Sequence, residues 1–184
     1  MTSENDAVKT VTGMMMVEAR TAPKSMGIDS LVTRTLDKDE TQAIASKMSE
    51  LGLKTGMAFF HTNADHVKNS DMMVLIGIKG RIPLGANCGG CGHVTCAMFV
   101  KATQEFQVDA DYPGPNCIFK ITDLGIATGS AVKCAASHNI DNRVMYTAGV
   151  AARKLGLMED CTVVYGIPLK VSGRNIFFAQ ELKH

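Results

Sequence analysis

The feature that most constrains this chain is a short string rich in cysteine and glycine, Asn87-Cys88-Gly89-Gly90-Cys91-Gly92-His93-Val94-Thr95-Cys96. A fourth cysteine follows twenty-one positions later, in Gly114-Pro115-Asn116-Cys117. Cysteines that only fill a core do not normally occur three times within nine residues of a glycine-rich loop. Glycine has no Cβ and accepts positive φ angles, so such a loop can fold tightly around something small. The string therefore requires a fold that brings this loop and the Gly-Pro turn together.

Four thiolates in one place suit an iron–sulfur cluster, which is held at its corners by cysteine sulfur. The two-residue gap between Cys88 and Cys91 lets two ligands leave one tight loop. Cys96 is predicted on the first turn of a helix and Cys117 just before another, so that two positive helix ends face an anionic cluster. The sequence thus predicts a 4Fe-4S site within residues 84–118, with the ligands Cys88, Cys91, Cys96 and Cys117.

A structural zinc site with four cysteine ligands is the alternative at the same residues. Zinc sites usually combine two close pairs of ligands, whereas here three ligands are clustered and one is remote. His93 could replace a cysteine in either site, but we interpret it as a residue at the helix start. A thioredoxin-type redox pair would leave two cysteines unused. We interpret the remaining thiols, Cys134 and Cys161, as small apolar side chains of the core.

Composition sets the outer limits. With 184 residues we expect a single domain over 1–184. The net charge of +1 and the pI near 7.6 argue against a nucleic-acid partner. No apolar run reaches the eighteen residues of a membrane span. Acidic residues within the first six positions are unlike a secretory signal, so we expect a cytoplasmic protein whose thiols stay reduced.

Hydrophobic periodicity predicts strands separated by helices, which indicates a mixed α/β or α+β domain. Strands are predicted over 31–36, 72–78 and 162–167. Helices are predicted over 7–22, from Asp37 to Gly52 or Gly56, and over 93–106, 118–137 and 148–155. Phe59-Phe60 begins an element of open type, while 65–70 is interpreted as a turn and 109–116 as a loop. Gly125 and Gly129 are interpreted as admitting another element close to the long helix.

At the cysteine string the sequence resembles the 4Fe-4S domain of Rnf-type electron-transfer subunits and corrinoid-pathway proteins. That domain reads Cys-x-x-Cys-Gly-x-x-x-Cys, with a fourth cysteine near proline and glycine after a helix; the last gap here is a few residues longer. The wider chain resembles uncharacterised prokaryotic ferredoxin-domain-containing proteins, and the matching pieces are 19–24, 75–77, 114–117, 123–127, 141–143 and 166–169. The resemblance to the 4Fe-4S domain implies electron transfer, for which we expect a redox partner protein, whereas the wider family has no settled function to imply.

A further resemblance is to FMN-dependent nitroreductases. It rests, in order, on Ala22-Pro23-Lys24-Ser25, the helix from Asp123, Leu155-Gly156-Leu157 and Gly166-Ile167-Pro168. It implies a nitroreductase-like sheet with packed helices and an inserted cysteine-rich loop, and it is compatible with a homodimer. The Arg-rich phosphate-binding segment of nitroreductases has no match here. Residues that could bind the flavin phosphate in its place are Arg20, Lys24 and Arg174. The alternative, which we favour, is that they are solvated surface charges.

Three functions are consistent with these patterns. The first is a cluster-binding electron carrier, and the second is a flavoprotein oxidoreductase in which the cluster feeds electrons to FMN. The third is a protein with structural zinc and no redox role. The sequence leaves open whether the protein is an enzyme.

Overall fold

The apolar run Met72–Ile78 forms the central strand β2 of a four-stranded sheet. The structure is a computed structural model that describes residues 3–105 and 110–178. The sheet has the order β1-β2-β4-β3, and every pair is antiparallel. Its other strands are β1 (Leu31–Leu36), β3 (Asp141–Asn142) and β4 (Val163–Lys170).

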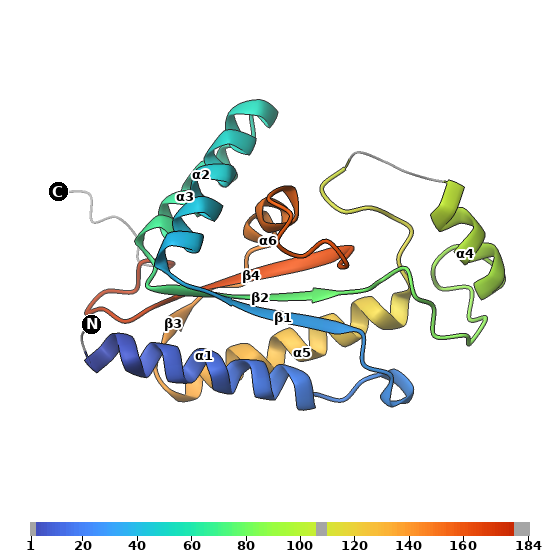
Figure 1. Cartoon of the computed structure of the whole chain (residues 1–184), viewed down its shortest axis with the longest axis horizontal. Coiled ribbons are helices and arrows are strands. Elements are labelled where there is room, and N and C mark those ends of the chain that lie inside the picture. The colour runs from blue at the N-terminus through green and yellow to red at the C-terminus, as the bar shows by residue number, and fades with distance from the viewer. Residues whose placement is uncertain (1–2, 106–109, 179–184) are drawn as a thin grey trace.

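Helices cover both faces of this sheet (Figure 1). One face carries α2 (Lys38–Thr55), α3 (Ala58–Asn69) and α6 (Tyr146–Lys154), and the other carries α1 (Ser3–Thr21) and α5 (Ile118–Ser137). Side chains of β2 alternate between the two cores. Met73 and Leu75 pack with the first group of helices, and Val74, Ile76 and Ile78 pack with the second. Because both of its faces are covered, β2 reads as an unbroken apolar run.

Helix α6 approaches the backbone of β4 closely at Gly149. A Cβ atom placed there would lie 1.7 Å from the carbonyl oxygen of Val164. On the strand, Gly166 gives the same kind of clearance, since a Cβ there would lie 2.6 Å from that of Ala148. The two glycines therefore set the distance at which this helix packs on the sheet.

Strand β4 runs three residues beyond its predicted end, through Pro168. Gly166 exchanges both of its backbone hydrogen bonds with Met145, so the main-chain groups of alternate residues point to the β3 side. The missing N–H of Pro168 therefore also faces β3. That strand pairs only with Leu169 and Lys170, so the proline breaks no ladder bond.

Three other expectations need correction. Residues 65–70 are not a turn, since α3 runs through Asn69 and its buried face carries Phe60, Ala64 and Val67. Helix α4 (Cys96–Glu105) begins three residues later than predicted, and Phe106 and Asp109 lie outside the described residues. The interpretation of Gly125 and Gly129 was wrong, because a Cβ at either would meet no atom within 4 Å.

The cysteine-rich segment projects from one end of the sheet. In Figure 1, α4 stands apart from the two helical layers, beyond the end of β2 and the start of α5. No helix in the described part of the chain has both the length and the apolar character needed to cross a membrane.

The close approach at Gly149 yields a prediction with a matched control. Gly149→Ala should lower the free energy of unfolding by more than about 3 kcal/mol, because the obstructing atom belongs to the backbone and cannot turn aside. Gly129→Ala, in a helix but facing open space, should raise it by about 0.5–1 kcal/mol. Urea denaturation of the two variants measures both effects, and equal destabilisation would contradict the packing described.

Candidate functional site

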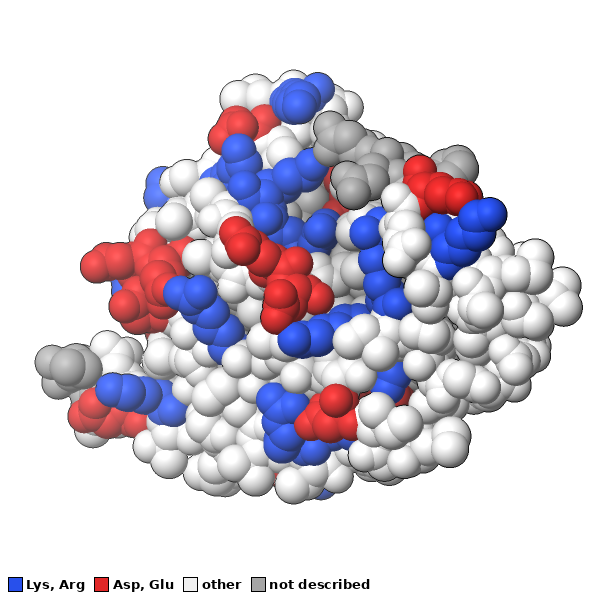
Figure 2. Space-filling view, turned by 45° about the vertical axis from the view of Figure 1, so that its right-hand side comes forward, with Lys and Arg blue, Asp and Glu red and all other residues white. Residues whose placement is uncertain are grey.

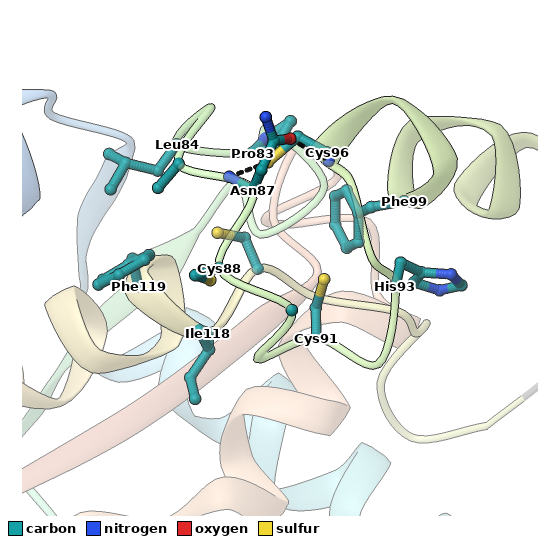
Figure 3. Close-up of a pocket in the computed structure, with 13 residues that line it drawn as sticks. Pro83, Leu84, Asn87, Cys88, Cys91, His93, Cys96, Phe99, Ile118 and Phe119 are labelled. Atoms are coloured by element: carbon teal, nitrogen blue, oxygen red, sulfur yellow. Dashed lines mark hydrogen bonds between the residues drawn. The ribbon is translucent and has the colours of Figure 1, made fainter.

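All four cysteines of the predicted site line one pocket at the projecting end of the molecule. In Figure 3 the labelled Cys88, Cys91 and Cys96 come from the loop and from the start of α4. Cys117 reaches the same pocket from the N-cap of α5. Their exposure is graded: Cys88 is exposed, Cys91 and Cys96 are half-buried, and Cys117 is buried. The fold thus brings together the four residues that the spacing selected.

Local backbone conformation explains how the loop turns. Gly89 and Gly92 have φ angles of 74° and 83°, which favour glycine. Asn87 also has positive φ, and its side-chain oxygen accepts the N–H of Cys96 at 2.8 Å. Its own N–H donates to the sulfur of Cys96 at 3.4 Å (Figure 3). Asn87 therefore closes the loop onto the start of α4, a role that the sequence analysis missed.

The fourth cysteine belongs to the body of the protein. The N–H of Cys117 donates to the carbonyl oxygen of Gly80 at 2.8 Å, just after the end of β2. The preceding turn is fixed as well, since Asn116 donates to Pro113 O at 3.0 Å and accepts from the hydroxyl of Thr162. Three candidate ligands thus lie on the projecting segment and one is anchored to the sheet.

The surroundings suit an anionic group. Helix α4 begins at Cys96 and α5 follows Cys117, so both positive helix ends are at the pocket. Residues 82–100 contain no charged side chain, and the corresponding right-hand part of Figure 2 is largely white. The remaining wall is apolar, formed by Pro83, Leu84, Phe99, Ile118 and Phe119. Because the wall is uncharged, the two positive helix ends determine the electrostatic potential in the pocket, and this potential favours a negatively charged group.

The spacing of the thiols bears on which metal group they fit. Within residues 3–105 and 110–178, no three Cys, His, Asp or Glu side chains lie close enough to hold a single metal ion. One zinc ion at about 2.3 Å from each sulfur would need the thiols nearly in contact. A four-iron cluster is larger and takes its ligands at its corners. The four cysteines around this pocket are the ligand set that either group would need.

His93 does not join the four thiols. Its ring turns away from the sulfur atoms (Figure 3) and meets the ring of Phe99 edge-on, with centroids 6.2 Å apart. Cys134 and Cys161 lie in the two cores, as expected. Burial raises the pKa of both thiols, that of Cys161 to about 11. These two sulfurs are therefore protonated and apart from the pocket.

The residues suggested for a flavin phosphate do not lie together within the chain. Arg20 pairs with Asp29 and donates to Leu31 O, at the start of β1. Lys24 donates to three carbonyl oxygens at the end of α1, and burial lowers its pKa. Arg174 follows the end of β4. The strand register places this end of β4 at the other end of the sheet from Leu31. Arg20 and Lys24 are neighbours, but Arg174 is at the far end of the sheet.

Two buried charges near the site were not selected from the sequence. Lys120 is fully buried and donates to Ile28 O at 3.0 Å. Asp123 is 1% exposed and accepts the N–H and hydroxyl of Ser25 at 2.9 and 2.8 Å. Together they tie the turn at η1 (Ser25–Gly27) to the first turns of α5. The helix that carries Cys117 is thus held at both the sheet and this turn.

Comparison with solved structures identifies the fold. Nitroreductase A from Vibrio parahaemolyticus is similar over 91% of this chain and 60% of its own, with a TM-score of 0.55 and 12% identity. NADPH:FMN oxidoreductase from Vibrio harveyi, solved with NAD+, is similar over 95% of this chain and 62% of its own, with a TM-score of 0.53 and 15% identity. This chain therefore spans about three fifths of their length. The fold is nitroreductase-like, as expected.

Sequence comparison identifies the family. An uncharacterized protein from Archaeoglobus fulgidus is 42% identical over 180 residues, which cover 98% of this chain and 95% of that protein. Residues 113–179, which include Cys117, match the family described as "Uncharacterized protein containing a ferredoxin domain (DUF2148)". The chain belongs to this family of ferredoxin-domain proteins.

Proposed function

We propose that this protein binds one 4Fe-4S cluster through Cys88, Cys91, Cys96 and Cys117 and transfers electrons. The observation that carries the proposal is the convergence of these four thiols on one uncharged pocket beneath two helix ends. Membership of a ferredoxin-domain family supports it. When bound, such a cluster supplies a site for the gain and loss of single electrons.

The protein's own residues would divide the work between insulation and access. Cys117 is buried against the body, and Phe99, which lines the same pocket, is fully buried, so these parts of the wall exclude water. Cys88 is exposed and gives the pocket an open edge. Apolar side chains of the same projecting segment are also exposed, among them Val94 (74%) and Met98 (53%). An as yet unidentified redox partner protein would exchange electrons at this uncharged edge.

A flavoprotein oxidoreductase is the second candidate, favoured by the nitroreductase-like fold. The Arg20 and Lys24 pair would have to bind the FMN phosphate without Arg174, unless a homodimer brings the opposite end of a second sheet alongside.

Structural zinc at the four cysteines is the third candidate. We also propose that the protein works in the cytoplasm, a reducing compartment in which thiols such as the four of the pocket stay available as ligands.

Anaerobic reconstitution with iron and sulfide tests the proposal. About four iron and four sulfide per chain, with visible colour, are expected for the unaltered protein. Cys91→Ser should remove most of the colour and bound iron, because it deletes one ligand. Cys134→Ser, a matched change in the core, should leave both nearly unchanged.

The same samples separate the three candidates. Stoichiometric zinc without sulfide, even after reconstitution, would overturn the redox proposal. Bound FMN beside the cluster would support the oxidoreductase. A loss of colour in Cys134→Ser but not in Cys91→Ser would contradict the ligand assignment.

Because three ligands lie on the projecting segment and one on α5, a bound cluster should clamp that segment to the body. In the structure, the loop meets α5 where a Cβ at Gly90 would lie 2.9 Å from Ile118. Removing the cluster with a chelator should therefore speed proteolytic cleavage within residues 84–95 by tenfold or more. Cleavage products are identified by mass spectrometry. Equal cleavage rates with and without the cluster would show that the segment is fixed by packing alone.

A further inference from the structure

A second hollow lies behind the cysteine pocket, at the ends of β2 and β4. Its volume is about 420 Å³, within the range of small-molecule sites. Among its lining residues are three cations, Lys79, Arg81 and Arg153, and two acids, Glu159 and Asp160. Figure 2 shows Lys and Arg side chains gathered around a recess, with acidic side chains beside it.

The charges in this hollow are not balanced in the same way. Lys79 and Asp160 form an ion pair at 2.8 Å, so they neutralise each other. The guanidinium of Arg153 is held by carbonyl oxygens, Cys161 O at 2.8 Å and Asp111 O at 3.0 Å. These carbonyl groups are neutral, so they fix the position of the guanidinium without pairing its charge with an acid.

Arg81 adds a second guanidinium to the same wall. It donates to Gly114 O at 3.1 Å. Its positive charge, after burial, is a cause of the lowered pKa of Arg153, so the two guanidinium groups repel each other. Glu159 lies beside the turn at Gly156. Its carboxylate oxygen is 3.2 Å from the position that a Cβ atom on Gly156 would take. An oxyanion seated between the two arginines would relieve the repulsion and accept hydrogen bonds from both.

The hollow and the cysteine pocket share a wall. Residues 79, 81 and 82 line the hollow, while residues 83 and 84 of the same strand extension line the cysteine pocket. On the facing segment, Pro113 borders the hollow and Cys117 the pocket. Between them, the N–H of Gly80 donates to Thr162 and its oxygen accepts from Cys117. Since two residues span at most about 7 Å, Arg81 and Pro83 are within that distance.

We infer that the hollow at Arg81 and Arg153 binds a small oxyanion, a phosphate- or carboxylate-bearing molecule, next to the cluster site. Both sources share the negatively charged oxygens that a guanidinium pair recognises. The binding itself does not depend on the cluster. Its influence on the cluster rests on the proposed function: a bound anion adds negative charge beside the iron and makes reduction harder.

Calorimetric titration of the full chain, with and without reconstituted cluster, tests the binding. Inorganic phosphate and succinate are the two probes, and saturable binding of at least one is expected. Arg153→Gln should weaken it at least tenfold. Lys133→Gln, which removes an exposed cation of α5 paired with Glu18, should leave it unchanged. If Arg153→Gln fails to fold by circular dichroism, Arg81→Gln takes its place.

The outcomes separate this inference from the proposed function. No binding of either probe, or equal weakening by Lys133→Gln, would overturn the anion site whether or not a cluster is present. Binding of phosphate but not succinate, or the reverse, would support the site and identify the source of the oxyanion. With the cluster bound, the saturating probe should shift its midpoint potential to more negative values, and no shift would overturn the adjacency.

Discussion

The hydrogen bond from the N–H of Cys117 to Gly80 O, at 2.8 Å, joins the N-cap of α5 to the segment just after the central strand β2. The cysteine pocket and the hollow at Arg81 both lie next to this hydrogen bond. It places one thiol at a fixed position relative to both cores, and it leaves the cysteine-rich segment to be built around that position. It also forms part of the wall shared with the hollow at Arg81. If this bond were lost, the pocket and the hollow would no longer be held in a fixed position relative to each other.

Charge is distributed so that each part of this end has a separate role. The segment that presents three cysteines has no charged side chain over residues 82–100, so the helix ends determine its local potential. The cations begin just outside it, at Lys79, Arg81 and Lys101. For the proposed cluster, neutral surroundings would avoid fixed ion pairs that have to rearrange whenever an electron arrives. A neutral edge would also let the proposed partner protein approach without matching a pattern of charges.

Much of this could be predicted from the sequence, and the failures have physical causes. The strand 72–78 could be predicted because both of its faces are buried, so it is an unbroken apolar run. The shared site of the four cysteines could be predicted because packing in a core does not explain their spacing. Helix α3 was missed since the exposed polar residues Asp65, Lys68 and Asn69 make the stretch 65–70 resemble a turn, although Val67 within it is buried. The role of Asn87 depends on a positive φ angle and one hydrogen bond, which no periodicity reveals. Arg174 was grouped with Arg20 because separation along a sheet is set by strand register, not by composition.

The division of ligands between a projecting segment and the body has a consequence for how the site forms. Cys117 is positioned by bonds that exist without any metal: its own to Gly80, and those of Asn116 to Pro113 and Thr162. The other three thiols are ordered mainly by glycine turns and by Asn87. The proposed cluster would therefore meet one preformed ligand and three held by fewer contacts with the body, which would lower the entropy cost of closing the site without requiring it to be rigid. Cys117 would then determine where the cluster sits, and the loop would determine how well it is enclosed.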